Sequence, residues 1–366
     1  MWIEKTGIEN FRNFRYQSVD FCNGVNIIYG DNAQGKTNLM EALWLLTGFH
    51  SFRTRKSAEL ILFGEKNALI KSHFHDSYGE NLTEIKLEPN SKKIVFNGEE
   101  IKSRSHYIGK FQAVLFSPVT MNLINGSPQE RRRFVDIAMS ALYPKYSCNI
   151  VRYNAILKQR NSILKNYDNS PKENDILLDY YDEALAETGA ILTVLKRDYI
   201  DKIKKYAYDA YALISDNKDS MKLHYCSQIC NGDENEEEVK TRFIERLQKS
   251  RKYDAEDNIT SIGPHRDDIA FYINSKSAKI FASQGQRRSA ALAVKFAEAV
   301  ISEDETKEIP IIMLDDVMSE LDQQRQHDLF KNLKNCQTVI TCCDKDQVRR
   351  FTEGKYFEIK NGEIFY

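Results

Sequence analysis

The stretch "GDNAQGKT", Gly30–Thr37, decides the fold class that this 366-residue sequence predicts. It matches the pattern G-x-x-x-x-G-K-[ST], and it lies between an apolar strand-like run, Val25–Tyr29, and a segment with leucines at helical spacing. In that context the backbone N–H groups of the loop and the helix N-terminus surround phosphate oxygens. A chance glycine turn before a helix is the alternative. The sequence therefore predicts an α/β fold with a phosphate-binding loop.

Each residue type in this loop has a chemical reason. Glycine permits backbone conformations in which N–H groups curl around a phosphate. Lys36 would reach the β- and γ-phosphates of ATP, and the Thr37 hydroxyl would bind Mg²⁺. The predicted nucleotide-binding residues of the loop are Gly30, Asp31, Asn32, Ala33, Gln34, Gly35, Lys36 and Thr37.

A second motif, "IPIIMLDDVMSELD", Ile309–Asp322, has the pattern of a buried strand that ends in two carboxylates. Ligands of open α/β sheets bind at the carboxyl ends of the strands. Asp315 would hold Mg²⁺, directly or through water, and Asp316 would orient or deprotonate an attacking water. Two acids in a polar turn are the alternative. Lys36, Asp315 and Asp316 are accordingly the candidate catalytic residues, and Thr37 and Asp315 are the candidate metal ligands.

The segment "SQGQ", Ser283–Gln286, permits two interpretations. Ser283 and Gln286 have the spacing of a capping box, in which each side chain satisfies a free backbone N–H at a helix start. Gly285 has no role in such a cap, and glycine weakens a helix by up to about 1 kcal/mol relative to alanine. Glycine is useful where a γ-phosphate approaches the backbone closely. The two interpretations are compatible, so Ser283, Gly285 and Gln286 are predicted nucleotide-binding residues as well as a cap.

The charge balance excludes a global polycation. Lys and Arg total 52 and Asp and Glu total 53, so any DNA contact must come from a local patch. Two clusters are candidates for phosphate contacts: Arg131, Arg132 and Arg133 at a helix start, and Arg53 with Arg55 near the phosphate-binding loop. Cations at a helix start are unfavourable, because they oppose the helix dipole. Contact with DNA phosphates would explain the three arginines there, and a solvated helix face is the alternative.

The cysteines and the first residues bear on location. Seven cysteines, an odd number at scattered spacing, suit reduced thiols in a cytosol. The opening "MWIEKTGIEN" lacks the basic and apolar regions of a signal peptide, and the sequence has no run of 18 apolar residues. We therefore expect a cytoplasmic protein.

Periodicity predicts an α/β domain that is split in sequence by a helical insertion. Residues 1–120 show strand-like patterns, residues 121–255 are mostly helical, and residues 256–366 return to strands. Hairpin turns are predicted at Asn97-Gly98 and Asn361-Gly362.

Taken in order, the motifs resemble those of the RecF family, an ABC-type ATPase family of the SMC-like branch, across essentially the whole chain. The segments that carry the resemblance are "IENFRNF", "GDNAQGKTNLMEAL", "SFRTRKSAELI", "VLFSP", "NGSPQERRRFVD", "TSIGPHRDDIAFYINS", "SQGQRRSAALAVKFAE" and "IIMLDDVMSELD". The resemblance implies an ABC-type ATPase lobe with a mostly helical second lobe and without a long coiled coil.

The resemblance also implies a function in recombinational repair and replication restart. An ATP-dependent homodimer would bind single-strand gaps and junctions in DNA. With RecO and RecR it would promote loading of RecA and SOS induction. Its Ser283–Gln286 segment would bind the ATP held by the other subunit, and a weak, DNA-stimulated ATPase would act as a switch. The alternatives are a transporter's nucleotide-binding subunit, an SMC-like structural or nuclease-associated ATPase, and a P-loop GTPase or kinase.

Several positions follow the family pattern loosely. Arg12 and Asn13 match a stretch near the nucleotide in SMC-like proteins, with a surface turn as the alternative. Where ABC ATPases usually have a Gln after an apolar strand, this sequence has Ser117. Where they have a switch His, it offers Thr341 or Cys342. "SELD", Ser319–Asp322, resembles the D-loop. Gly263–Asp268 matches the family, but its chemistry suggests no role.

Overall fold

The computed structural model describes residues 1–366 except 122, 168–169, 319–325, 327–334, 345 and 350–352. The chain forms two compact units. Unit 1 consists of Met1–Asn122, Asp209–Asp219 and Ser283–Tyr366, and unit 2 of Leu123–Tyr208 and Ser220–Ala282. The sequence placed the return to the ATPase lobe at residue 256, whereas in the structure it lies at residue 283. The strand-like segment after residue 256 belongs to a small sheet of unit 2 instead.

A mainly parallel sheet forms one part of unit 1, in the order β15-β14-β3-β13-β12-β8. Its strands are buried apolar runs, as expected for a parallel sheet covered on both faces. The predicted strand Val25–Tyr29 is confirmed as β3, between two strands from much later in the sequence. The other strands are β8 (Ala113–Phe116), β12 (Ile311–Asp315), β13 (Thr338–Cys342), β14 (Lys355–Lys360) and the antiparallel β15 (Glu363–Phe365).

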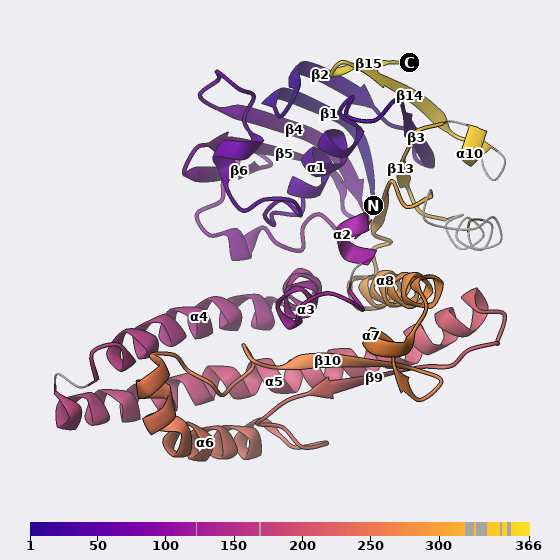
Figure 1. The fold of residues 1–366 in the computed structure, drawn as a ribbon. Coiled ribbons are helices and arrows are strands. Elements are labelled where there is room, and N and C mark those ends of the chain that lie inside the picture. Colours follow the sequence, from indigo (N-terminus) through magenta and orange to yellow (C-terminus); the bar gives the residue numbers. More distant parts are fainter. Residues whose placement is uncertain (122, 168–169, 319–325, 327–334, 345, 350–352) are drawn as a thin grey trace. The chain divides into compact units, whose positions relative to one another are not determined.

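An antiparallel sheet, in the order β2-β1-β4-β5-β6-β7, completes the strands of unit 1. Its strands are β1 (Trp2–Phe11), β2 (Phe14–Asp20), β4 (Ala68–Asp76), β5 (Gly79–Glu88), β6 (Ser91–Phe96) and β7 (Glu99–Glu100). Helix α1 (Lys36–Leu45) contacts strands of both sheets, namely β1, β12 and β13 (Figure 1). The other helices that the structure describes in unit 1 are α2 (Pro118–Met121), α8 (Gln284–Thr306), α10 (Asp346–Arg349) and the 3-10 helices η1 (Ser57–Leu60) and η2 (Arg104–His106).

Unit 2 is mostly helical, as predicted, with a sheet in the order β11-β10-β9. Its elements are α3 (Pro128–Leu142), α4 (Pro144–Leu164), α5 (Pro171–Ile214), β9 (Met221–Cys226), α6 (Glu236–Asp257), β10 (Asp268–Ile273), β11 (Lys276–Ser277) and α7 (Ala278–Phe281). Helix α3 begins with a capping box of Ser127 and Glu130. Helix α5 has 44 residues (Figure 1). Its end, from Asp209 on, belongs to unit 1. None of the helices described combines the length and apolarity that crossing a membrane requires.

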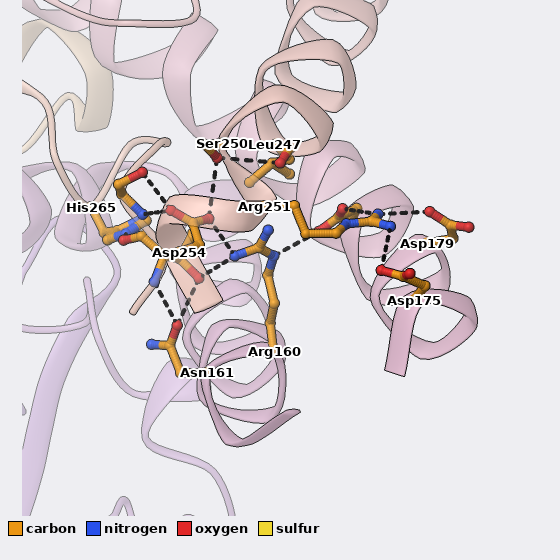
Figure 2. A network of polar contacts seen from close by, with 12 residues as sticks. Arg160, Asn161, Asp175, Asp179, Leu247, Ser250, Arg251, Asp254 and His265 are labelled. Atoms are coloured by element: carbon orange, nitrogen blue, oxygen red, sulfur yellow. Dashed lines mark hydrogen bonds and ion pairs between the residues drawn. The ribbon is translucent and has the colours of Figure 1, made fainter. Parts of the chain in front are cut away.

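A buried ionic network joins α4, α5 and α6 (Figure 2). Arg160 of α4 is fully buried, and its Nε lies 2.6 Å from Asp182 Oδ1 while its Nη1 lies 2.8 Å from Asp254 Oδ2. Arg251 of α6 donates to the second oxygen of Asp182 at 2.8 Å. Buried charges persist only when they are paired and hydrogen-bonded, so this network fixes which helices pack together.

Replacing Arg160 with Met is expected to destabilise unit 2 by about 3 kcal/mol, because two buried carboxylates lose their cation. We place the loss at the low end of the range for broken buried pairs, since Arg251 still contacts Asp182. Urea unfolding of the variant measures it. Lys249→Met, which removes only an exposed pair with Glu245 on the same helix, is the matched control. Equal stability of the two variants would contradict the expectation.

The segment Gly263–Asp268, to which the sequence assigned no role, holds the core of unit 2 together. Gly263 has φ +130°, and a Cβ there would lie 2.6 Å from Phe243 and from the Tyr153 hydroxyl. His265 Nδ1 accepts from the Tyr153 hydroxyl at 2.6 Å, and its Nε2 donates to Thr260 O at 3.0 Å. The segment therefore requires both a glycine and a neutral histidine.

Stability in acid tests the neutral state of His265. Burial lowers the pKa of His265 from 6.5 to about 4. Below pH 6.5 this histidine is protonated in the unfolded chain but stays neutral in the folded chain. The free energy of unfolding therefore falls as the pH drops toward 4, by up to about 3 kcal/mol. His265→Gln lacks this titration. Urea unfolding at several pH values should show the wild type losing its advantage over the variant between pH 6.5 and 4, and parallel curves would contradict this.

Candidate functional site

The phosphate-binding loop Gly30–Thr37 joins β3 to α1, as predicted. Gly30 has φ +149°, and a Cβ at this position would lie 2.4 Å from the carbonyl oxygen of Ile359 on β14. Gly35 has φ +124°, and a Cβ there would lie 2.8 Å from the side-chain amide of Asn13. Both glycines are required by close packing as well as by conformation.

Lys36 is buried within the loop that precedes it. Its ammonium donates to the carbonyl oxygens of Gly30 at 2.6 Å and Asp31 at 2.8 Å, with Cys343 Sγ at 3.8 Å. Its side chain is 7% exposed, and over the part of the chain that the structure describes no carboxylate pairs with it. A buried cation that is satisfied only by neutral groups is suited to receive an anion.

Asp315 lies at the carboxyl end of β12, where the sequence placed it. Its Oδ1 accepts from the hydroxyls of Thr37 at 3.1 Å and Thr341 at 2.9 Å. The Thr341 hydroxyl in turn accepts from Asp316 N at 2.9 Å, and Asp316 has φ +53°. Thr341 at the end of β13 therefore contacts the carboxylate of Asp315 and the backbone of Asp316.

The residues present fit Mg²⁺ with a nucleotide. Asp315 is 2% exposed, and burial raises its pKa. Among the described residues no cation pairs with this carboxylate, and the hydroxyls that donate to it are neutral. A bound cation would therefore stabilise its ionised form. Thr37 and Asp315 offer hard oxygen ligands, which Mg²⁺ prefers. Lys36 beside them would balance phosphate charge.

The segment Ser283–Gln286 forms the predicted capping box at the start of α8. Ser283 Oγ accepts from Gln286 N at 3.2 Å, and Gln286 Oε1 accepts from Ser283 N at 3.0 Å. Gln286 Nε2 also donates to Asp219 Oδ2 at 2.9 Å, a partner that the sequence did not indicate. Ser283 is exposed, so the cap leaves the helix start open to a ligand.

Asn13 and Arg12 lie against the nucleotide loop and its helix. Asn13 Nδ2 donates to Gln34 O at 2.9 Å, so this residue supports the loop directly and is not a free surface turn. Arg12 donates to both carboxylate oxygens of Glu41 on α1 at 2.8 Å. Glu41 is fully buried, and no role of its own was predicted for it from the sequence.

The turn of the β14–β15 hairpin, Asn361-Gly362, also contacts the loop. Gly362 N donates to Gln34 O at 3.1 Å, and Asn361 N donates to Gln34 Oε1 at 2.5 Å. The hairpin that the sequence predicted is confirmed, but its contact with the loop was not foreseen.

The structure shows the surroundings of Ser117, Thr341 and Cys342, which stand where ABC ATPases usually have a Gln and a switch His. Ser117 lies in a local turn, where its backbone N donates to the Thr120 hydroxyl at 2.8 Å and its own hydroxyl accepts from Thr120 N at 3.3 Å. Thr341 contacts the Asp315 carboxylate and the Asp316 backbone. Cys342 is buried, which raises its pKa to about 12. The next residue, Cys343, is the one beside the loop, because its Sγ lies 3.1 Å from Asn32 Oδ1. The predicted D-loop, Ser319–Asp322, lies outside the described residues.

The arginines predicted to contact DNA differ in how buried they are. Arg131 is 4% exposed, and its guanidinium donates to both oxygens of Asp268 at 2.6 and 2.8 Å. It is therefore a buried structural residue, and the prediction that it contacts DNA is wrong. Arg132 is half-buried and donates to Asp267 O at 2.7 Å. Arg133 is half-buried too.

Arg53 and Arg55 of the second cluster are exposed. Arg53 also donates to Asn38 Oδ1 at 2.7 Å and pairs with Glu41, so it belongs to the surroundings of α1. Contact of these two residues with DNA stays a prediction.

Known proteins resemble this chain over its whole length. The DNA replication and repair protein RecF of Clostridium perfringens is 36% identical over 367 residues, covering 100% of this chain and 99% of that protein. RecF of Thermoanaerobacter pseudethanolicus is 36% identical over 371 residues, with the same two coverages.

Solved structures agree. A structure of the recombination mediator protein RecF-ATP in the RecFOR pathway matches with a TM-score of 0.93 and 35% identity, covering 100% of this chain and 97% of that one. A head domain of Smc bound to ScpA matches with a TM-score of 0.57 and 16% identity, which supports the fold alone. The family model described as "RecF/RecN/SMC N terminal domain" covers residues 2–362. With full-length relatives and a family model that spans nearly every residue, this chain belongs to the RecF family.

Proposed function

We propose that this chain is an ATP-dependent DNA-binding protein of replication and recombinational repair. The observation that carries the proposal is the cluster of Lys36, Thr37 and Asp315, in which buried charges of opposite sign lack ionic partners among the described residues. Relatives at 36% identity are named as RecF, and a similar solved structure is described as RecF with ATP. The transporter, nuclease-associated and GTPase or kinase alternatives have no support of this kind.

The chain's own residues would divide the work on ATP. Lys36 would exchange its carbonyl partners for phosphate oxygens, and the loop's N–H groups and the start of α1 would hold the same phosphates. Thr37 and Asp315 would hold Mg²⁺, which neutralises phosphate charge when bound. Asp316, whose backbone N is held by the Thr341 hydroxyl, would position an attacking water and accept its proton.

ATP would join two copies of the chain. The start of α8 carries an exposed Ser283 and a helix dipole, both suited to a γ-phosphate presented by a second copy. Each nucleotide would then contact the loop of one copy and the Ser283–Gln286 segment of the other. Because these contacts exist only in the dimer, ATP would shift the equilibrium toward it, and slow hydrolysis would release it.

DNA with single-strand gaps or junctions would be the target of this dimer. RecO and RecR would be its partners in promoting RecA loading and SOS induction, in keeping with the RecFOR pathway of the similar solved structure. Arg53, Arg55, Arg132 and Arg133 are the remaining candidates for backbone contacts, so binding should weaken with salt. The DNA target and the free cysteines agree with a cytoplasmic location.

Light scattering tests the proposal, with the wild type and Ser283→Arg each measured without nucleotide, with Mg-ADP and with Mg-ATP. We expect the solution mass to double only with Mg-ATP, and only for the wild type, because an arginine blocks the start of α8. ATP binding to the isolated variant should persist, since its loop is intact. A wild-type mass that ATP leaves unchanged, despite measured ATP binding, would refute the dimer mechanism.

A further inference from the structure

Both the oxygen and the nitrogen of the Gln286 side-chain amide are hydrogen-bonded. Its Oε1 accepts from Ser283 N at 3.0 Å, and its Nε2 donates to Asp219 Oδ2 at 2.9 Å. An amide can be rotated by half a turn with little change in shape, so its orientation depends on its partners. A carboxylate only accepts, and therefore it holds the NH₂ end of Gln286 toward itself. Asp219 thus reinforces the orientation in which the capping box is closed.

Asp219 is itself held in place by the end of α5. The helix ends in a left-handed turn at Asp216 and Asn217, with φ +51° and +58°. Asn217 N donates to Ala212 O at 2.8 Å, which closes the helix end, and Ser215 Oγ donates to Asp219 O at 3.3 Å. One turn earlier Tyr211 is 1% exposed, so this end of the helix is anchored in unit 1.

We propose that Asp219, in the loop that follows α5, is a positioning residue for the Ser283–Gln286 segment. The inference rests on the proposed function, in which this segment closes on the ATP of a second copy. Through Gln286, the carboxylate keeps Ser283 and the first N–H groups of α8 aimed outward. Asp219 and the Ser283–Gln286 segment both belong to unit 1, so this contact lies within one unit.

A variant of Asp219 should keep its affinity for ATP but lose dimer formation, whereas a general loss of structure would lower both. Asp219 has no part in the loop around Lys36, so the affinity of a single chain for ATP should be unaffected. Dimer formation and turnover at saturating ATP should fall, because both need the Ser283–Gln286 segment. For a half-buried charge-assisted hydrogen bond we expect about a tenfold loss in each.

Three variants test it: Asp219→Ala, Asp219→Asn and Lys218→Ala. Asp219→Asn keeps an oxygen that accepts from Gln286, so it should restore dimer formation to near the wild-type level. Lys218→Ala removes an exposed pair with Asp216 in the same loop and should match the wild type. The measurements are ATP affinity of the monomer at low protein concentration, ATP-dependent mass by light scattering, and turnover at saturating ATP.

Two outcomes would overturn the inference while the proposed function stands. Asp219→Ala could dimerise as well as the wild type or better, which would mean that the carboxylate does not position the segment or opposes phosphate. Alternatively, all three variants could be equally impaired, which would mean that the loop matters only for folding. If the wild type itself stays monomeric with Mg-ATP, the proposed function fails and this inference fails with it.

Discussion

Lys36→Met is expected to weaken ATP binding by about 10³-fold, equivalent to about 4 kcal/mol. Methionine fills a similar volume, but it has no charge to offer the β- and γ-phosphates. In the structure Lys36 contacts carbonyl oxygens of its own loop, and a neutral carbonyl binds an ammonium more weakly than a triphosphate does. The loss should therefore appear in nucleotide affinity far more than in folding.

Equilibrium binding of a fluorescent ATP analogue would measure this loss, and thermal unfolding without nucleotide would measure folding. Lys66→Met serves as the control, because it removes a cation from a surface loop of the same unit. An affinity within threefold of the wild type would show that Lys36 does not reach the phosphates. A variant that unfolds much earlier than the wild type would show that the lysine acts mainly on the fold.

Asp316→Asn is expected to lower the ATP hydrolysis rate by about 10³-fold while leaving ATP binding nearly unchanged. Asparagine keeps the size of the side chain and tolerates the left-handed backbone at φ +53°. It cannot accept a proton from water, so only the chemical step should suffer. With hydrolysis blocked, the ATP-bound dimer should persist.

Single-turnover hydrolysis and light scattering over time would test this pair of effects together. The matched variant is Asp315→Asn, which alters the predicted Mg²⁺ ligand and should weaken binding of Mg-ATP as well as its hydrolysis. Equal behaviour of the two variants would contradict the division of roles between the neighbouring acids. A normal hydrolysis rate for Asp316→Asn would mean that another residue is the general base.

Local sequence patterns predicted those features that depend on neighbouring residues. The loop before α1, the strand that ends in Asp315, the capping box at Ser283 and both Asn-Gly turns each rest on a few consecutive residues. The chemistry of such segments is visible in one window, because phosphate loops, caps and tight turns constrain residue types at fixed offsets.

The features that escaped prediction depend on partners far away in the sequence. Arg131 was read as exposed because it sits among arginines at a helix start, yet Asp268 lies 137 residues later and pairs with it. Asp219 gave no signal, since a single acid in a polar loop is ordinary. Likewise, β10 has the alternation of any half-buried strand, and nothing in that pattern says which sheet it joins.

The strand order around β3 has a consequence for synthesis of the protein. The phosphate loop is translated early, but β3 pairs with β13 and β14, which are made about three hundred residues later. At roughly 5–20 residues per second, the ribosome needs about 15–60 s to supply those partners. The nascent chain therefore carries an apolar central strand without neighbours while all of unit 2 is being made. Protection of that strand by chaperones should matter more for this chain than its modest length suggests.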